Sequence, residues 1–448
     1  MTAAPARAGR AADAMRRGLA AIDRRALLCG LVGLGVLAAL SWYVAWHVPR
    51  SGWLFGAHYD GGFKDLMYRI KNVYSARHGG VLYTSVLKTT EYFVYPPATL
   101  WLFWPLTWVT RASLKASHFT GELLWTFTSL LSLAWMIASA ARNACGWRWP
   151  KAWAVSLLVA APLSAIVLQP VAVHLALGQV GLLLAAPAVF DILCVRDQRW
   201  RGALTGVTAA LKLYPVVYFA IFALRREWRA LGNAVAAMAA TTAIAWAVFP
   251  SYSATYFLHR LLGGSELRHY WHNAHWISSS SSLYTLFFRQ PFTGTAPERT
   301  VGLALCVGAI ALGIYAAWRQ LAEGREVAAL LCVALGSTIG SPVAWDHYFI
   351  WVVLVPFVLV EAGTLPWWRT GSLGLFVLTC LVPLRLARNE NLSHTAYDWI
   401  FVVIFTARNA LTAVSLLGLV VASIPWPRAR EAQPSAASTV SHQARTAG

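Results

Sequence analysis

The chain has 448 residues, of which 58% are hydrophobic and only 12% are charged, and its mean hydropathy is +0.53. This composition excludes a soluble globular protein, whose core helices would carry regular polar faces. The formal net charge of +19 could indicate nucleic-acid binding, but its Lys and Arg residues cluster beside apolar runs, which is typical of the cytoplasmic loops of membrane proteins. We therefore expect an all-α polytopic membrane protein and no nucleic-acid partner.

Both ends of the chain are predicted to lie in the cytoplasm. Residues 1–25 are rich in Ala and Arg and are expected to form a disordered basic N-terminus in the cytoplasm. The apolar run 26–46 then crosses the membrane outward, and no small-residue cleavage site follows it, so it does not resemble a cleavable signal. At the other end, residues 425–448 have the Pro/Ser/Ala composition of a disordered cytoplasmic tail.

Between these ends we expect a transmembrane domain at 26–424 with about 11–13 membrane segments. The runs 26–46, 231–249, 301–318 and 401–424 each approach the roughly 20 residues that cross a bilayer. Further apolar segments are predicted at 93–110, 118–141, 152–168 and 178–194. Two long external loops are predicted, at about 47–92 and 251–300. The six cysteines have neither metal-ligand nor disulfide spacing.

The stretch 202–224 allows two topologies. Basic residues precede it at 196–201 and follow it at 225–229, so a full crossing would place one basic loop outside, against the positive-inside rule. A re-entrant hairpin would instead break near Lys212-Leu-Tyr-Pro215, because proline lacks an amide donor and disfavours helix before it. The basic segment 142–151 raises the same question, because the number of membrane crossings around it decides on which side of the membrane it lies. Either geometry places Lys212 within the membrane.

Ionisable residues at the membrane rim are candidates for chemistry, because a charge at membrane depth costs several kcal/mol unless it faces protein or water. Asp346 and His347 lie side by side where an apolar run begins, and the first external loop offers Asp60 and Asp65. A base at this rim could deprotonate an incoming hydroxyl while a cation steadies a departing anion. The chain has no Asp-x-Asp, Gly-rich phosphate loop or Gly-x-Ser-x-Gly motif, so we expect no metal, no cofactor and no nucleotide hydrolysis.

These residues also resemble a known family, glycosyltransferase family 87, over about residues 50–360. The resemblance rests on the order and spacing of several short motifs. They are Asp65-Leu-Met-Tyr68, Gly79-Gly-Val-Leu-Tyr83, Tyr95-Pro-Pro97, Gly178-Gln179, Lys212-Leu-Tyr-Pro215 with Arg225-Arg-Glu-Trp-Arg229, and Ser341-Pro-x-x-Trp-Asp-His-Tyr348. The resemblance implies a GT-C fold in the cytoplasmic (inner) membrane, with an active site on the external face. It also implies a polyprenyl-phosphate sugar as donor.

The resemblance assigns roles to individual positions. Asp65 occupies the position of the family's catalytic aspartate, although Asp60 is a second candidate, and His347 matches another polar group of the pocket. The segment 278–282 departs from the family pattern, which leaves the recognition of the acceptor open. Further positions are expected to contact the substrates: Gln179, Tyr95, Lys212, Arg69, Lys71, Trp345, Asp346 and Tyr348.

The implied reaction moves mannose from polyprenyl-phosphate mannose to a lipid-linked mannoside, such as a phosphatidylinositol mannoside or lipomannan. Well-studied family members form α-(1→2) linkages. Asp65 or His347 would take the hydroxyl proton in a single inverting displacement, while Lys212, or Arg69 and Lys71, would steady the leaving phosphate. The expected partners are the lipid-linked donor, a glycolipid acceptor and the bilayer, and the oligomeric state is open.

Each assignment has a structural alternative. Asp65 could be a solvated loop acid, Asp60 a turn residue, Asp346 a helix cap and His347 a packing residue. Lys212 could extend its ammonium to the nearest surface. Two other functions also stay open. A polyprenyl-phosphate arabinofuranosyltransferase would differ in the shape of its donor pocket, which the sequence does not show. A lipid or solute transporter should show broken helices in matching positions of two halves, and the sequence has no such pairing.

Overall fold

The computed structural model of the chain describes residues 24–51, 53–54, 57–58, 62–80, 82–83, 93–109, 119–262, 296–341, 344–363, 365–381 and 408–424. Its N-terminal half contains α2 (Arg24–Ser51), β1 (Trp53–Leu54), β2 (Ala57–His58), α3 (Lys64–Arg77), η1 (Pro97–Thr99), α4 (Leu100–Phe103), α5 (Leu106–Val109), α6 (Phe119–Cys145), α7 (Trp149–Val155), η2 (Ser156–Ala160), α8 (Ala161–Val167), α9 (Gln169–Leu177), α10 (Gly181–Cys194), α11 (Ala203–Leu211), η3 (Tyr214–Tyr218) and α12 (Phe219–Leu224). The C-terminal half contains α13 (Trp228–Val248), α14 (Pro250–Ala254), η4 (Thr255–Leu261), α18 (Ala296–Ala322), α19 (Glu326–Ile339), η5 (Asp346–Leu354), α20 (Val355–Ala362), α21 (Trp367–Thr379) and α24 (Arg408–Ser423). The predicted disordered ends lie outside the described residues, apart from Arg24 and Arg25, which begin α2.

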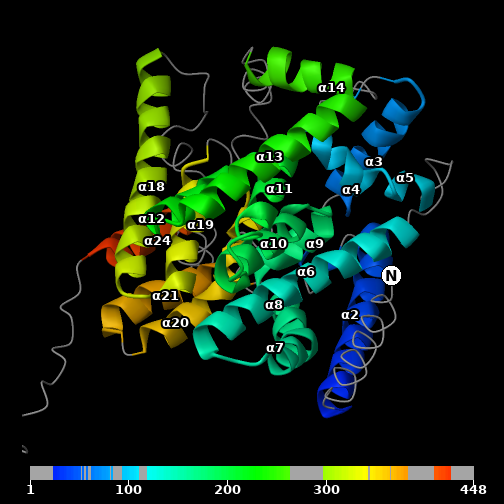
Figure 1. Ribbon diagram of the computed structural model, residues 1–448. Coiled ribbons are helices and arrows are strands. Elements are labelled where there is room, and N and C mark those ends of the chain that lie inside the picture. The colour runs from blue at the N-terminus through cyan, green and yellow to red at the C-terminus, as the bar shows by residue number, and fades with distance from the viewer. Residues whose placement is uncertain are drawn as a thin grey trace, which may run out of the picture.

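Long apolar helices dominate the molecule (Figure 1). Among the described residues, five stretches are long and apolar enough to cross a membrane: 28–50, 119–145, 149–167, 228–248 and 300–322. Large apolar side chains on these helices face outward, such as Leu28, Val235 and Val307, which is the pattern of a protein surrounded by lipid. The prediction of an all-α polytopic membrane protein is confirmed. Because segments of the chain lie outside the described residues, the count of 11–13 segments stays a prediction.

The stretch 202–224 is a hairpin rather than a full crossing. The helix α11 ends at Leu211, Lys212 has an extended backbone, and η3 and α12 return the chain. The return is visible in the contact between its two ends, because Arg201 Nε donates to Glu227 Oε2 at 2.7 Å. Of the two topologies that the sequence allowed, the re-entrant one is therefore present, and its break lies at Lys212.

The basic segments that were difficult to place on one side of the membrane meet at one carboxylate, that of Glu326. Arg225 lies 3.2 Å from Glu326 Oε1 and Arg196 lies 4.0 Å from the same atom. Asn143, at the end of α6, donates to Glu326 Oε2 at 2.8 Å. The segments near 143, 196 and 225 consequently lie on one face, and the positive-inside rule is satisfied there.

Small residues let neighbouring helices approach closely. A Cβ on Gly206 of α11 would meet the Ala234 carbonyl of α13, and a Cβ on Gly313 of α18 would lie 2.8 Å from the Gly336 Cα of α19. Helices in lipid associate through such close packing, because burial of apolar surface gives little preference between a helix and a lipid tail. These two contacts hold the hairpin and the pair α18–α19 in place.

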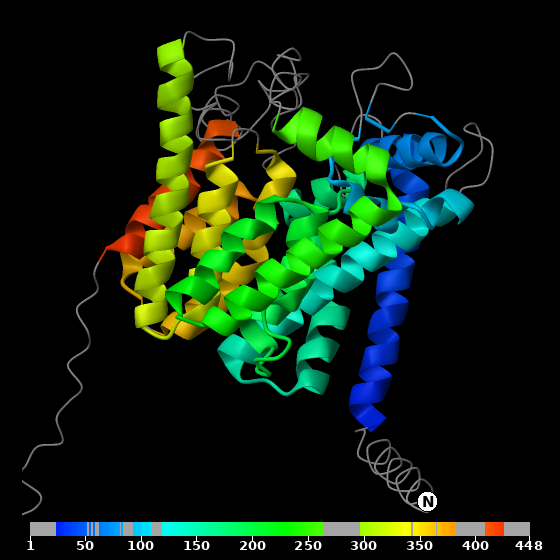
Figure 2. The ribbon, with the colours of Figure 1, turned by 45° about the horizontal axis from the view of Figure 1, so that its top comes forward.

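Three segments differ from the sequence prediction. The predicted first external loop contains the 14-residue helix α3, and the predicted second external loop begins as α14 and η4. The residues 169–177, expected to connect two membrane segments, form the buried helix α9. Figure 2 shows α3 and α14 together across one end of the bundle, where Tyr252 Oη donates to the Gly80 carbonyl at 3.1 Å.

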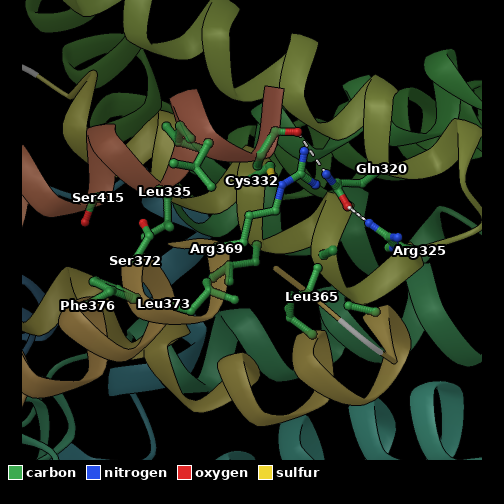
Figure 3. A pocket seen from close by; sticks show the side chains of 18 of the residues that line it. Gln320, Arg325, Cys332, Leu335, Leu365, Arg369, Ser372, Leu373, Phe376 and Ser415 are labelled. Carbon is green, nitrogen blue, oxygen red and sulfur yellow. Dashed lines mark hydrogen bonds between the residues drawn. The ribbon is translucent and has the colours of Figure 1, made fainter. Parts of the chain in front are cut away.

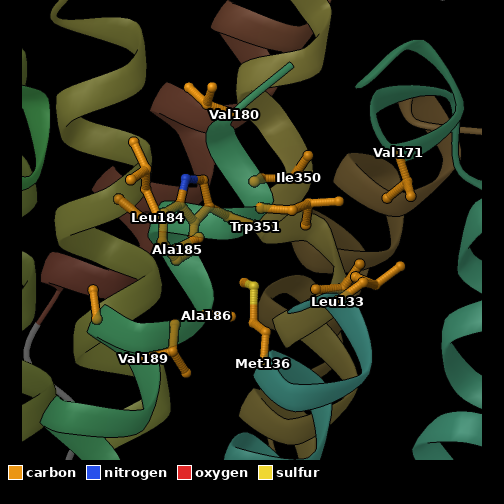
Figure 4. Packing of buried hydrophobic residues seen from close by; sticks show 14 of the residues in the cluster. Leu133, Met136, Val171, Val180, Leu184, Ala185, Ala186, Val189, Ile350 and Trp351 are labelled. Carbon is orange, nitrogen blue, oxygen red and sulfur yellow. The ribbon is translucent and has the colours of Figure 1, made fainter. Parts of the chain in front are cut away.

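A packed apolar core lies between α6, α10 and η5. Figure 4 shows Trp351 and Ile350 among Leu184 and Ala185 of α10, with Leu133 and other α6 residues alongside. Trp351 is only 2% exposed. This core fixes the start of η5, which carries His347 and Tyr348 to the candidate site described next.

Candidate active site

The helix α3 is fixed against the turn that follows α9. Phe63 precedes α3 with a left-handed backbone, and its N–H donates to the Ala176 carbonyl. Gly178 also has a positive φ, of +69°, and a Cβ there would lie 2.5 Å from the Leu66 side chain. Only glycine meets both demands without strain. The turn therefore holds the first turn of α3, which carries Asp65, close to Gln179.

Asp65, Gln179 and Tyr95 form a hydrogen-bonded chain across three segments. The Gln179 amide nitrogen donates to Asp65 Oδ2. Tyr95 Oη in turn donates to Gln179 Oε1, at 3.5 Å. Gln179 and Tyr95 are each 6% exposed, whereas Asp65 is partly exposed. Asp65 is thus held by a buried amide and is not the solvated loop acid that the sequence left as an alternative.

Burial shifts the ionisation of Asp65. It raises the pKa of this carboxyl above its ordinary value of 3.8, and the cations of Arg69, Lys64 and Lys212 oppose the rise. The hydrogen bond from Gln179 also opposes it, because it favours the charged form. A carboxylate with a raised pKa is a stronger base than a solvated one, so Asp65 is suited to accept a proton.

A cavity of about 230 Å³ lies beside Gln179. Its lining comes from the α9–α10 turn, the Lys212 break, the end of α19 and the start of η5. The lining residues are Gln179, Gly181, Lys212, Leu213, Tyr214, Ser337, Thr338, Ser341, His347, Tyr348, Ile350 and Trp351. The predicted residues Gln179, Lys212, His347 and Tyr348 are therefore brought together from distant parts of the sequence.

Lys212 presents its ammonium to three tyrosine rings at this cavity. Its Nζ lies 4.9 Å from the centroid of the Tyr348 ring and 5.4 Å from those of Tyr95 and Tyr214. Within the part of the chain that the structure describes, Lys212 has no hydrogen-bond or ion-pair partner. Aromatic faces attract a cation but leave its N–H donors unused. The cavity therefore holds a cation that is available to an anionic ligand.

His347 is buried at the cavity wall, with 6% of its surface exposed. Its ring centroid lies 4.8 Å from that of Tyr348 and 6.4 Å from that of His174 on α9. His174 accepts a hydrogen bond from the Leu182 N–H through Nε2, at 3.2 Å, so this second histidine braces the α9–α10 turn. His347 therefore stands at the cavity, while His174 lies behind it.

The other predicted residues lie around the cavity rather than in its lining. Gln169 of α9 donates to Asp346 Oδ2 at 3.1 Å, which ties the start of η5 to α9. The Arg69 guanidinium lies 5.1 Å from the centroid of the Tyr95 ring. Among the described residues, the predicted positions that do not belong to the lining are Asp65, Tyr95, Trp345, Asp346, Arg69 and Lys71. Their predicted substrate contacts stay predictions.

Asp60 lies outside the described residues, as does the segment 278–282 of the predicted second external loop. The choice between Asp60 and Asp65 as base, and the recognition of the acceptor, therefore stay predictions. In the residues that the structure does describe, no group of three or more His, Cys, Asp and Glu side chains could hold a metal ion.

Sequence reasoning missed three contributors to the site: Gln169, His174 and Tyr214. Gln169 and His174 lie between the predicted membrane segments 152–168 and 178–194, where the sequence predicts only a connection. Two polar residues inside an otherwise apolar stretch are a signal of a functional or bracing role at membrane depth. Tyr214 belongs to the Lys212-Leu-Tyr-Pro215 motif, but only the hairpin turns its ring toward the Lys212 ammonium.

The model of glycosyltransferase family 87 matches residues 93–344. No solved structure matches the chain.

Curated relatives carry related names. A polyprenol-phosphate-mannose-dependent alpha-(1-2)-phosphatidylinositol mannoside mannosyltransferase of Mycobacterium tuberculosis is 29% identical over 68% of this chain and 70% of its own length. Its namesake in Mycolicibacterium smegmatis is 27% identical over 68% and 71%. A phosphatidylinositol pentamannoside mannosyltransferase of M. tuberculosis, dependent on the same donor, is 26% identical over 74% of each chain.

Proposed function

The chain belongs to glycosyltransferase family 87, and we propose that it transfers mannose from polyprenyl-phosphate mannose to a phosphatidylinositol mannoside or lipomannan. The family match makes the chain a membrane glycosyltransferase. The donor and the phosphatidylinositol mannoside acceptor follow the names of the relatives in two mycobacterial species, whereas lipomannan follows the family resemblance. The α-(1→2) linkage rests on the same names.

One observation carries the proposal: a carboxylate and an ammonium that has no ion-pair partner among the described residues border the same site. Gln179 lines the cavity and holds Asp65 through its amide, while Lys212 faces the cavity from the hairpin break. Transfer from a polyprenyl phosphate needs both groups, a base for the acceptor hydroxyl and a cation for the leaving phosphate. The cavity of about 230 Å³ is somewhat smaller than the roughly 300–1,000 Å³ of typical small-molecule pockets, and its aromatic walls suit a sugar ring.

The proposed reaction is a single displacement at the anomeric carbon. Asp65 takes the proton of the acceptor hydroxyl as the hydroxyl oxygen forms a bond to that carbon. The bond from the same carbon to the phosphate oxygen breaks, and its electron pair leaves with the polyprenyl phosphate. The configuration inverts, so that a β-linked donor gives an α-mannoside. His347 is the alternative base, and no metal ion is required.

The phosphate changes from one negative charge to two in this step. Lys212 is the proposed partner for the added charge, because its ammonium faces the cavity without a hydrogen-bond or ion-pair partner among the described residues. Three aromatic rings hold the ammonium in position before the reaction, so little reorganisation is needed as charge develops.

The active site is proposed to face the exterior of the cytoplasmic membrane. The support comes from the opposite face, where basic residues gather around Glu326. The positive-inside rule assigns that face to the cytoplasm. The helix α3 is then at the external end of the bundle (Figure 2).

The test is mannose transfer by the purified protein in detergent, with radiolabelled polyprenyl-phosphate mannose and phosphatidylinositol mannosides. Asp65→Asn, Asp60→Asn and His347→Ala are assayed beside the wild type, and a polyprenyl-phosphate arabinose donor forms a parallel arm. We expect transfer of mannose that is lost in Asp65→Asn and kept in Asp60→Asn. Transfer of arabinose alone would replace the proposed donor, and no transfer of either sugar would contradict the proposed reaction.

A further inference from the structure

A second cavity lies between α18, α19, α20, α21 and α24. Its lining residues are far from Lys212 in the sequence. Its volume is about 60 Å³, and apolar side chains form most of its wall. On α19 the lining residues recur with helical spacing, at Ala328, Leu331, Cys332 and Leu335. From Arg325 at the start of α19 to Leu335 the helix rises by about 15 Å, so the cavity follows the helix direction.

The cavity is amphiphilic along its length. Figure 3 shows Arg369, Gln320 and Arg325 together at one end and Ser372, Ser415 and Phe376 toward the other. Two arginines line it, and among the described residues no carboxylate does. Arg325 forms an ion pair at 2.8 Å with Glu323, which does not line the cavity. Arg369 donates a hydrogen bond to the Ile424 carbonyl at 2.7 Å.

Two buried hydroxyl groups face the cavity without a partner. Ser372 is 6% exposed and Ser415 is 1% exposed, and neither Oγ has a hydrogen-bond partner in the described structure. A buried hydroxyl without a partner is unfavourable, so a ligand oxygen that accepts a hydrogen bond from it is stabilised there. Ser372 lies one helical turn beyond Arg369, which places polar groups at two successive levels of the cavity.

We propose that this cavity binds an anionic phospholipid. The phosphate contacts Arg369 and Arg325, the ester oxygens accept hydrogen bonds from Ser372 and Ser415, and the start of an acyl chain occupies the apolar part. The cavity is too small for a whole lipid. The rest of the chain lies on the exposed apolar faces of α21 and α24, which carry Leu378 and Leu417.

The position of the cavity in the protein agrees with an anionic phospholipid as its ligand. Arg325 lies at the α18–α19 turn and Arg369 in the first turn of α21. The positive-inside rule assigns the α18–α19 turn to the cytoplasmic leaflet, in which basic pockets between helices bind acidic headgroups. The site is separate from the proposed transfer reaction, which takes place at Lys212 and Asp65.

The test is native mass spectrometry of the full chain in detergent, with phosphatidylglycerol or phosphatidylcholine of the same acyl composition. The wild type should retain phosphatidylglycerol about tenfold better, because a charged hydrogen-bonded contact contributes roughly 1.5–3 kcal/mol. Arg369→Gln should reduce this retention to the phosphatidylcholine level. Equal retention of the two lipids by the wild type would overturn the proposal.

A second variant removes the space and leaves the charges. A Cβ on Gly418 would have Ser372 Oγ as its nearest neighbour, at 3.8 Å, so Gly418→Leu fills the cavity without a backbone clash. The matched control is Gly374→Leu on α21, where a Cβ meets nothing within 4 Å. We expect loss of bound phosphatidylglycerol in Gly418→Leu alone. Wild-type retention in Gly418→Leu would also overturn the proposal, and this variant decides the question if Arg369→Gln does not fold.

Discussion

Replacement of Lys212 by methionine tests the proposed role of the cation. The methionine keeps most of the apolar stem and removes the charge that lies 4.9–5.4 Å from three tyrosine ring centroids. Two unit charges 4 Å apart interact by about 4 kcal/mol at an effective dielectric constant of about 20. If about half of the added phosphate charge has developed in the transition state, the loss is about 2 kcal/mol, or about 30-fold in kcat.

The assay is steady-state transfer of radiolabelled mannose, with kcat and KM measured separately for Lys212→Met and wild type. The matched control is Lys151→Met on α7, because Lys151 is exposed and does not line the cavity in the described structure. We expect the control to stay within about twofold of wild type and both variants to melt near the wild-type temperature. A kcat for a folded Lys212→Met within twofold of wild type would refute the reasoning.

Three further predictions concern ionisation, stability and metal dependence. As the pH falls through the raised pKa of Asp65, the base gains a proton, so the acidic limb of the pH–rate profile should lie above pH 3.8. Arg69→Met should move this limb to higher pH, since Arg69 is the strongest of the groups that lower that pKa; an unmoved limb would contradict the assignment. Asp191→Ala should lower the melting temperature, because the carboxylate accepts hydrogen bonds from the Gly202 and Thr205 N–H groups at 2.8 and 2.9 Å, each contributing roughly 1.5–3 kcal/mol. The exposed Asp197→Ala is its control, and equal melting temperatures would count against this role. EDTA should leave the transfer rate unchanged, and a rate restored by Mg²⁺ or Mn²⁺ after its loss in EDTA would contradict metal independence.

The membrane class was predictable because it depends on summed hydropathy. Runs such as 119–145 and 300–322 are too long and apolar for any other environment. The break at Lys212 was also foreseen as one of two topologies, since proline at 215 disfavours helix before it. Only the contact of Arg201 with Glu227 shows that the chain returns there.

The helices α3 and α9 could not be predicted in the same way. The sequence of α3 is polar, with Lys64, Arg69 and Arg77 among its residues, and its helix is stabilised by contacts with the turn at Gly178. Those contacts join residues more than 100 positions apart, which one sequence does not reveal. The motifs predicted which residues form the site, whereas the pairing of Asp65 with Gln179 required the fold.

The most direct test of the central claim is mannose transfer by Asp65→Asn, a variant that removes the charge and nearly preserves the shape of the side chain. The wild type should transfer radiolabelled mannose from polyprenyl-phosphate mannose to phosphatidylinositol mannosides. Asp65→Asn should lose at least about 100-fold in kcat, as is typical when a general base is removed, while it still melts as a folded protein. Transfer by Asp65→Asn at the wild-type rate would contradict the claim that Asp65 is the base of the reaction.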